Sequence, residues 1–341
     1  MSDDHFEGIN LFERTFRQQI QSNGEIAELN YLFTKKFGDR EDEWPVEANR
    51  YRLIWMPGCP HASKAVITWK LLGLDQVISL GTTGVLRSEK GWVFSEDPGG
   101  VDPVLKVHYL HDIYTRTYPD YTGRSTVPTI VDTLTGLAVN NDHANIPKYF
   151  ALSWRKYHKE NAPDLYPQYL REDIDTLNLW ILDHINNGVY HAGFARSQAA
   201  YEKGYAEFFQ AMDQMDQRLR SQRFLWGDFI TLSDIFLFVT LTRFQVTYYQ
   251  VFRANKQRLE DFENLWPYAR DLYQTEGFRD YTWLETIKRH YQLSPHLRAL
   301  FGNDAGILAK GPDLRVWEEP HHREKLSLHA EKFRREKPIV A

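Results

Sequence analysis

Residues 51–72 read YRLIWMPGCPHASKAVITWKLL, and this stretch decides the fold. It opens with an apolar run, Tyr51 to Met56, which has the composition of a buried strand, and a Pro-Gly turn follows. Pro60 suits the first turn of a helix, and the apolar residues after it repeat at helical spacing. They are Ala62, Ala65, Val66, Trp69 and Leu72. The pattern therefore predicts a strand, a tight turn and a helix, with Cys59 at the helix N-terminus.

Cys59 occupies a position that favours the thiolate. In comparable placements, free amide N–H groups and the positive end of the helix dipole lower a cysteine pKa from about 8.5 to roughly 3.5–7.5. We therefore expect a nucleophile at neutral pH, although a small buried hydrophobe is the commonest role of a lone cysteine. The chain has 1 cysteine in 341 residues, so it forms no internal disulfide and no multi-cysteine metal site. A mixed disulfide on Cys59 would need an external thiol to resolve it.

The chain changes in character near residue 160. Before that point, strand-like runs at Gln76 to Leu80 and Thr129 to Val131 continue a βαβ-type alternation. After it, two sets of apolar residues recur at helical spacing, and 232–244 and 265–273 favour further helices. The two sets are Leu170, Ile174, Leu177, Ile181 and Ile185, and then Tyr201, Tyr205, Phe208, Met212, Met215 and Leu219. An α/β domain joined to an all-α domain is predicted, with a linker at residues 161–167, which contain two prolines.

We place the domain boundaries as follows. Residues 1–45 form an N-terminal extension, 46–160 the α/β domain, 161–311 the helical domain, and 312–341 a charged C-terminal tail. The extension is polar and mixed, and the tail is rich in charge. We interpret both as solvated surface or as arms packed on a neighbour.

Composition argues against several classes of function. A net charge of -5 and a pI near 6.2 provide no broad positive field for nucleic acid. The acidic start MSDDHFEGIN is unlike a secretory signal or a transit peptide. The longest strongly apolar stretch, Ile235 to Leu241, is far shorter than the roughly 20 residues that span a bilayer. We therefore expect a cytoplasmic protein with no membrane segment and no nucleic-acid partner.

Three other features have two interpretations each. Val127-Pro128 is either a cis-proline that places backbone groups beside a thiol ligand or the start of an edge strand. His108 and His111 could ligate a metal from one helix face, but no third ligand has recognisable spacing, so we interpret them as a surface pair. Residues 231–234 (TLSD) are more typical of a helix start than of a functional site.

A series of short motifs from about residue 50 to 292 resembles the glutathionyl-hydroquinone reductases, the Xi class of glutathione transferases. The motifs are Cys59-Pro60 with Ala62, Lys90-Gly-Trp-Val-Phe94, Tyr121-Thr-Gly-Arg124, Thr126-Val-Pro128, Asn140-Asn141, Asn186-Asn-Gly-Val-Tyr190, Ala192-Gly-Phe-Ala195, Arg243-Phe244 with Tyr248, and Lys288-Arg-His-Tyr291. The resemblance implies a thioredoxin-like domain, a helical domain and a homodimer.

The resemblance also implies residue roles. The family's nucleophilic cysteine falls on Cys59, its proton-donating tyrosine on Tyr190, and two tyrosines that favour the thiolate fall on Tyr248 and Tyr291. The contacts to the thiol cosubstrate fall on Trp92, Arg124, Val127, Asp142 and His143. The implied activity removes a glutathionyl group, or that of another low-molecular-weight thiol, from an aromatic hydroquinone, and it needs no metal.

These side chains suit that chemistry. Attack on sulfur breaks a carbon–sulfur bond and leaves an electron-rich aromatic carbon that must be protonated. A phenol with a pKa of about 10 is a competent acid within hydrogen-bond reach, so Tyr190 could supply the proton. Hydroxyl donors from the other tyrosines could stabilise the thiolate.

The sequence departs from the family pattern beside the cysteine and at the thiol site. The family has CPWAHR where residues 59–64 read CPHASK, so an aromatic wall is lost and His61 adds a ring that would favour the thiolate if protonated. The Glu-Ser pair that grips the γ-glutamyl end of glutathione is Asp142-His143 here, and a usual Asp is Gln245. We expect weaker glutathione binding or a different thiol.

Two other functions stay open at this point. Conjugation of glutathione to electrophiles normally prefers a Ser or Tyr that stabilises the bound thiolate without becoming covalently modified. A non-catalytic interaction module with this fold is compatible with the altered residues His61, Asp142 and His143.

Overall fold

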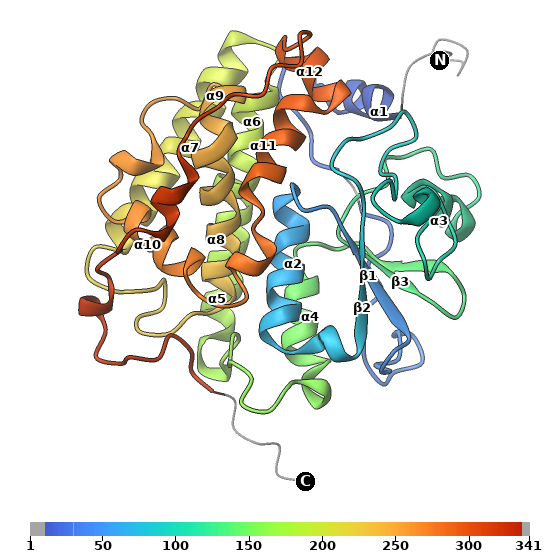
Figure 1. Ribbon diagram of the computed structural model, residues 1–341, viewed down its shortest axis with the longest axis horizontal. Helices are drawn as coiled ribbons and strands as arrows, with labels where there is room; N and C mark the ends of the chain where they lie inside the picture. Colours follow the sequence, from blue (N-terminus) through green and yellow to red (C-terminus); the bar gives the residue numbers. More distant parts are fainter. Residues whose placement is uncertain (1–10, 30, 336–341) are drawn as a thin grey trace.

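Four short strands form one mixed sheet in the computed structural model, which describes residues 11–29 and 31–335. The strands are β1 (Tyr51–Trp55), β2 (Ile78–Thr82), β3 (Thr129–Asp132) and β4 (Leu137–Asn140), in the spatial order β2-β1-β3-β4. β1 runs parallel to β2 and antiparallel to β3, and β3 pairs antiparallel with β4. All of β1 is buried because it is an inner strand with helices on both sides of the sheet (Figure 1).

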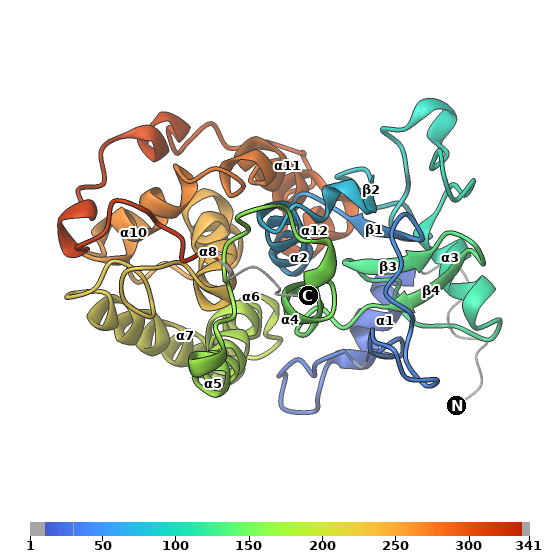
Figure 2. The same ribbon diagram turned by 90° about the horizontal axis from the view of Figure 1, so that it is seen from below.

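Helices α2 (Pro60–Leu71) and α4 (Ile146–Leu152) lie on one side of the sheet, and α3 (Leu110–Thr117) lies on the other (Figure 2). α2 is enclosed between the sheet and the helical half of the molecule, and nearly all of its residues are buried. This position explains why the helix after Cys59 is apolar on more than one side. The predicted order of strand, turn and helix is confirmed, with Cys59 as the N-cap of α2.

The second half of the chain folds into a group of helices, one of which, α8 (Leu232–Arg243), packs against α2 (Figures 1 and 2). They are α5 (Arg171–Ile181), α6 (Gly188–Phe194), α7 (Gln198–Arg218), α8 (Leu232–Arg243), α9 (Tyr249–Val251), α10 (Leu265–Tyr273), α11 (Leu284–Leu293) and α12 (Pro295–Phe301). A π-helical segment, Leu182–Asn187, joins α5 to α6, and another, Phe244–Tyr248, joins α8 to α9. Thr231 and Asp234 form a capping box that begins α8, so the interpretation of TLSD as a helix start is confirmed.

Several element boundaries differ from the sequence prediction. β2 begins at Ile78 rather than Gln76, because Leu74–Gln76 form a 3-10 turn. The helices predicted over 170–185 and 232–244 continue through the π-helical segments to Phe194 and Val251. The sequence pattern does not predict β4, because four residues are too few to establish a period.

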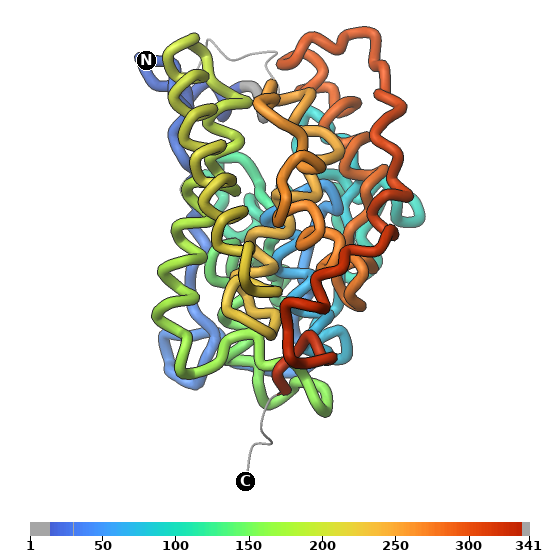
Figure 3. Tube along the Cα trace, turned by 90° about the vertical axis from the view of Figure 1, so that its left-hand side faces the viewer, coloured from blue at the N-terminus to red at the C-terminus, as the bar shows by residue number. Residues whose placement is uncertain are grey.

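The two ends of the chain pack along the surface of the molecule itself. The interpretation of the charged tail as solvated surface is confirmed for Glu318, Glu319, Glu324, Lys325, Arg334 and Arg335, which are exposed, but not for the buried Arg323. α1 (Leu11–Gln19) lies beside α12 in Figure 1. The C-terminal tail, red in Figure 3, runs along the outer surface of the helical half. In that tail Trp317 is fully buried, and the Arg323 guanidinium donates a hydrogen bond of 3.0 Å to the Leu219 carbonyl oxygen. Residues 1–10 and 336–341 of the two predicted segments lie outside the described residues.

Candidate active site

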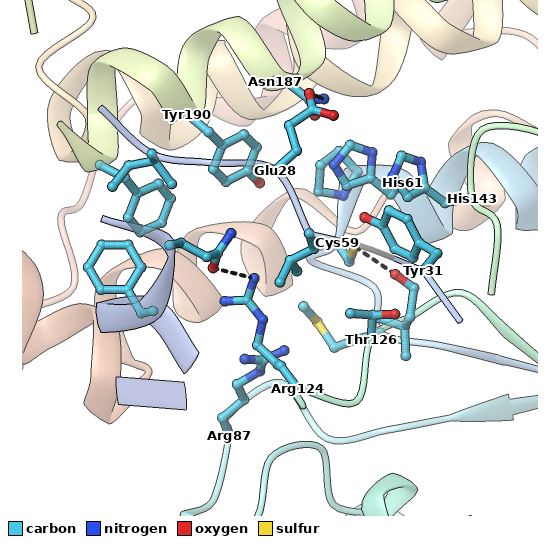
Figure 4. A pocket seen from close by; sticks show the side chains of 18 of the residues that line it. Glu28, Tyr31, Cys59, His61, Arg87, Arg124, Thr126, His143, Asn187 and Tyr190 are labelled. Carbon is cyan, nitrogen blue, oxygen red and sulfur yellow. Dashed lines mark hydrogen bonds between the residues drawn. The ribbon is translucent and has the colours of Figure 1, made fainter. Parts of the chain in front are cut away.

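A cavity of about 410 Å³ opens between the sheet half and the helical half, beside Cys59 (Figure 4). Its walls contain all but one of the residues that the resemblance implies for the site. The residues in the walls are Cys59, Trp92, Arg124, Val127, Asp142, His143, Tyr190 and Tyr291. The exception, Tyr248, is fully buried behind the wall. Its hydroxyl is hydrogen-bonded to those of Tyr190 and Tyr291, which do line the cavity. The fold therefore brings the whole predicted set together, while the role of each residue stays a prediction.

Cys59 lies where the start of α2 meets the loop before β3. Its sulfur is 3.5 Å from the carbonyl oxygen of Val127. The Val127-Pro128 peptide bond is cis, and β3 is an inner strand, so the cis-proline is confirmed and the edge-strand interpretation is wrong. That this loop pairs with a thiol ligand stays a prediction. The backbone N–H groups of Ala62 and His61 donate to the Cys59 sulfur. The thiol thus has the helix N-terminus on one side and the cis-proline loop on the other.

The pKa of Cys59 is raised, and the prediction of a lowered value is wrong. Burial raises the pKa of the thiol, and this effect exceeds the lowering by the Ala62 amide, the Arg243 charge and the His61 amide. The predicted amide donors are present, but the cavity walls remove water that would otherwise solvate the thiolate. Local sequence indicates the donors and does not indicate the burial.

Three tyrosine hydroxyls form a closed hydrogen-bonded triangle at the helical wall. The Tyr190 and Tyr291 hydroxyl oxygens are 2.5 Å apart, Tyr248 and Tyr291 are 2.8 Å apart, and Tyr190 and Tyr248 are 3.0 Å apart. Burial raises the pKa of Tyr190 and Tyr248 well above the ordinary value and that of Tyr291 to about 12. All three phenols therefore keep their protons at neutral pH and can act as donors.

At one end of the cavity, Asp142 and His143 lie near His61. The Asp142 carboxylate accepts hydrogen bonds from Asn145, 2.8 Å from its side-chain nitrogen and 3.3 Å from its backbone nitrogen. The rings of His61 and His143 have centroids 4.0 Å apart. Burial lowers the pKa of both imidazoles well below the ordinary value, so both are neutral. His61 therefore does not provide the positive charge that a protonated ring would.

Two arginines lie on the opposite side of Cys59 (Figure 4). Arg124 donates a hydrogen bond of 3.2 Å to the Gln19 side-chain oxygen. The guanidinium of Arg87 lies 4.0 Å from the centroid of the Trp92 ring. Burial lowers the pKa of both arginines, that of Arg87 to about 9. Arg87 belongs to none of the sequence motifs that indicate the site, and the resemblance implies no role for it.

The N-terminal segment forms part of the cavity wall, which no local sequence pattern indicates. Phe16 packs on the ring of Phe194 at 5.5 Å, and the Asn187 amide donates a hydrogen bond of 2.6 Å to Glu28. These contacts join residues more than 150 positions apart, so no local pattern could indicate them. Residues from this segment in the cavity wall include Phe16, Gln19, Ile26, Glu28 and Tyr31.

The described residues hold no group of three or more side chains that could bind a metal ion. The ring of His108 is 2.9 Å from the Gly100 carbonyl oxygen, and that of His111 is 3.0 Å from the Ser125 hydroxyl. The two histidines thus make separate local hydrogen bonds. In the part of the chain that the structure describes, no helix combines the length and apolarity that crossing a membrane requires.

Comparison with known proteins gives consistent results. Residues 198–274 match the family of glutathione S-transferase C-terminal domains. The chain is 37% identical over 282 residues to the glutathionyl-hydroquinone reductase YqjG of Escherichia coli K12, covering 82% of this chain and 84% of that protein.

Solved structures show the same fold. A glutathione transferase from Gordonia bronchialis superposes with a TM-score of 0.82 at 45% identity, covering 86% of this chain and 90% of that one. A Xi-class glutathione transferase from Natrialba magadii gives 0.81 at 36% identity, covering 89% and 96%. The glutathione-bound structure of YqjG gives 0.79 at 33% identity, covering 87% and 97%. The predicted thioredoxin-like domain with an all-α domain is therefore confirmed.

Proposed function

Because the chain belongs to the glutathionyl-hydroquinone reductases, the Xi class of glutathione transferases, and is an enzyme of that oxidoreductase type, we propose that it removes a glutathionyl group, or that of another low-molecular-weight thiol, from aromatic hydroquinones. In this proposal the reaction passes through a mixed disulfide on Cys59. The observation that carries this proposal is the shared cavity. The Cys59 side chain and two of the three tyrosines of the hydroxyl triangle, Tyr190 and Tyr291, line the same space.

The reaction has two steps. In the first, the Cys59 thiolate attacks the sulfur of the adduct, a sulfur–sulfur bond forms, and the carbon–sulfur bond breaks. The electron pair of that bond goes to the aromatic carbon, which takes a proton from Tyr190. The hydroxyls of Tyr248 and Tyr291 donate to the tyrosinate until it is reprotonated. The hydroquinone then leaves.

In the second step a free thiol attacks the mixed disulfide. It forms a low-molecular-weight disulfide and returns Cys59 as the thiolate. The net reaction consumes one adduct and one thiol and produces one hydroquinone and one disulfide. An external thiol is required because Cys59 is the only cysteine in the sequence.

The thiol site of the proposal uses Trp92, Arg124, Val127, Asp142 and His143. Val127 lines the cavity with its carbonyl oxygen 3.5 Å from the Cys59 sulfur, so in this proposal its backbone pairs with the cysteinyl part of the thiol. The Trp92 side-chain nitrogen is a buried donor with no partner among the described residues. That YqjG has been solved with glutathione bound supports glutathione as the first thiol to test.

A single-turnover experiment tests the mechanism. The protein is mixed with one equivalent of a glutathionyl-hydroquinone and no free thiol, and hydroquinone is measured by chromatography. We expect release of one equivalent together with one glutathionyl group on Cys59, seen by intact mass. Cys59→Ser should release none, and His108→Ala, an exposed position away from the cavity, should behave as the wild type. Release that persists in Cys59→Ser would contradict the proposal.

A homodimer in the cytoplasm is part of the same proposal. It rests on the family resemblance and on the single cysteine, which suits a reducing compartment. Light scattering coupled to size exclusion tests the dimer, and a molar mass near that of one chain would count against it.

A further inference from the structure

Residues 19–27 form a small hairpin that closes one side of the cavity. An antiparallel bridge between Ile20 and Ile26 holds its two arms together. Ile26 lines the cavity, and so does Glu28, which follows the hairpin directly. The hairpin therefore carries a carboxylate into the cavity wall.

The turn of this hairpin is fixed to the residues that precede α7. The Arg196 backbone N–H donates a hydrogen bond of 2.9 Å to the Gly24 carbonyl oxygen, and the Ser197 hydroxyl donates one of 2.7 Å to the Asn23 carbonyl oxygen. Gly24 has a φ of 86°, and a Cβ atom there would lie 2.7 Å from the Ser197 hydroxyl oxygen, so glycine suits this close approach. The position of Glu28 is thus set by contacts with the helical half.

A hydrogen bond places the Glu28 carboxylate near the proposed proton donor, Tyr190. The Asn187 side-chain nitrogen donates to Oε1 of Glu28 at 2.6 Å. Asn187 and Tyr190 are three residues apart where the π-helical segment continues into α6, so both side chains face the cavity from one side of the helix. Figure 4 shows the Glu28 carboxylate turned toward Asn187, on the same side of the cavity as Tyr190.

The proposed reaction brings the aromatic ring of the adduct to this part of the cavity. The ring carbon bonded to sulfur must reach the Tyr190 hydroxyl to take its proton. Phe194 stacks on Tyr190 with ring centroids 5.5 Å apart, and Phe16 packs on Phe194 at the same distance, so the walls beside the proton donor are apolar. A hydroquinone adduct carries a hydroxyl on the carbon next to the carbon–sulfur bond. That hydroxyl needs an acceptor, because a desolvated donor without a partner is costly.

Two carboxylates lie in the described part of the cavity wall, and they differ in their free acceptor sites. Both oxygens of Asp142 accept hydrogen bonds from Asn145. Glu28 accepts the Asn187 hydrogen bond through Oε1, and its Oε2 accepts none from the described residues. Glu28 is exposed although it lines the cavity, so an incoming adduct can reach its carboxylate.

We propose that Glu28 binds a hydroxyl group of the aromatic part of the substrate and so selects adducts with a free hydroxyl next to the carbon–sulfur bond. This inference rests on the proposed function, since it concerns the substrate of that reaction. Asn187 is a positioning residue, because it holds one oxygen of the carboxylate and leaves the other for the substrate. A site that accepts a hydrogen bond from a substrate hydroxyl discriminates against an analogue that lacks the hydroxyl.

Binding to the Cys59→Ser variant tests the role of Glu28 without turnover. The probes are S-(2,5-dihydroxyphenyl)glutathione and S-phenylglutathione, which differ only in the two hydroxyl groups, and calorimetry measures the affinity of each. One hydrogen bond to an exposed carboxylate predicts about fivefold tighter binding of the dihydroxy compound. Equal affinities, or no binding of either compound, would overturn the proposal.

Further variants in the Cys59→Ser background assign the preference to Glu28. In Glu28→Ala the preference should fall to less than about twofold, while S-phenylglutathione binds as before. Glu28→Gln should also lose the preference, because its one carbonyl oxygen accepts from Asn187 and an N–H donor replaces the second oxygen. An equal loss of affinity for both compounds would show that Glu28 binds the thiol part, such as its ammonium group, and would overturn the proposal. If Glu28→Ala does not fold, Glu28→Gln decides, since an unchanged preference there would overturn it too.

Glu25→Ala is the matched control. Glu25 belongs to the same hairpin but pairs with Lys203 at 3.0 Å and is not part of the cavity wall. The variant should keep the whole preference for the dihydroxy compound. A loss as large as in Glu28→Ala would show that the fold of the hairpin, and not the Glu28 carboxylate, decides the preference, and would overturn the proposal.

The outcome is separable from that of the proposed function. If the wild type never releases hydroquinone but the dihydroxy compound still binds in preference through Glu28, the reaction is wrong and the role of Glu28 holds. If release depends on Cys59 but the two compounds bind equally, the reaction holds and the role of Glu28 is wrong.

Discussion

The guanidinium of Arg243 in α8 donates a hydrogen bond of 3.0 Å to the carbonyl oxygen of Gly58, the residue before Cys59. The same group, 1% exposed, also donates to the Pro57 carbonyl oxygen at 3.1 Å and to the Ser63 hydroxyl at 2.8 Å. None of its hydrogen bonds in the described part of the chain ends on a carboxylate. The helical half thus holds the turn that positions Cys59, and the Arg243 charge lowers the Cys59 pKa against the effect of burial.

Arg243→Lys should therefore lower both the stability of the fold and the rate of the reaction at Cys59. Lysine keeps the charge but cannot reach all of these acceptors, so two or more buried carbonyl groups lose a charged donor. We expect the free energy of unfolding to fall by about 2–4 kcal/mol and kcat for hydroquinone release to fall at least about tenfold. Chemical denaturation and steady-state kinetics measure the two effects. Arg279→Lys on the surface is the matched control, and equal behaviour of the two variants would refute this role.

Removal of single tyrosine hydroxyls should separate the proton donor from its supporters. Tyr190→Phe is expected to lower kcat by about 10²–10⁴-fold, the usual contribution of a general acid. Tyr248→Phe should have a smaller effect, because Tyr248 acts through its hydrogen bonds to Tyr190 and Tyr291. The rate of Cys59 alkylation, which needs no proton donor, should be little changed in Tyr190→Phe. A larger loss in Tyr248→Phe would reassign the acid.

The reactivity of Cys59 should rise with pH into the alkaline range. Burial raises the pKa of this thiol, opposed by Arg243 and Arg87, so the alkylation rate of the protein without thiol should reach half its maximum above about pH 8.5. The folded state holds this proton more tightly than the unfolded chain does. The resulting stability is complete below about pH 8.5 and is lost as pH rises through the folded pKa.

His61→Phe should leave unchanged the pH at which the Cys59 alkylation rate reaches half its maximum. Burial keeps the His61 imidazole neutral, so it contributes no charge near neutral pH. The positive groups that act on Cys59 are instead Arg243, Arg87, Arg124 and Lys64. A shift of the midpoint by one pH unit in His61→Phe would show that the ring carries a proton after all.

Replacement of Lys64 should stabilise the protein at neutral and acidic pH. Burial lowers the pKa of Lys64 to about 7, whereas an unfolded lysine titrates at about 10.4. The unfolded chain binds more protons between these values, so the stability of the wild type rises with pH across that interval. Lys64→Met should raise the free energy of unfolding at pH 6 by about 1–4 kcal/mol and reduce this slope.

Urea denaturation at pH 6, 7, 8 and 9 measures the Lys64 effect. Lys70→Met is the control, because Lys70 lies on the same helix in a partly exposed pair with Asp75, and its loss should change stability by less than about 1 kcal/mol. If Lys64→Met destabilises the protein most at pH 6, the ammonium is favourable where it lies.

The features that the sequence predicted well are local. The strand, turn and helix around Cys59 occupy about twenty consecutive residues. The apolar run predicts the strand, Pro-Gly predicts the turn, and the spacing of apolar residues predicts the helix, so each signal lies within the element that it predicts. The same holds for the long apolar repeats of α5 and α7. The predicted site residues came from short motifs, and the cavity contains them because the fold of the family brings those motifs together.

Tertiary structure alone decided the electrostatics of the site and part of its walls. Whether Cys59 and His61 carry a charge depends on burial by residues that are distant in the sequence, which no local pattern records. The Arg243 contact with Gly58 spans 185 positions, and the Phe16 contact with Phe194 is of similar range. The amino-acid sequence by itself determined which chemical groups this protein has and where several of its helices begin, α2 and α8 among them. The packing of distant segments determined which of those groups lose water, and therefore which of them hold a proton.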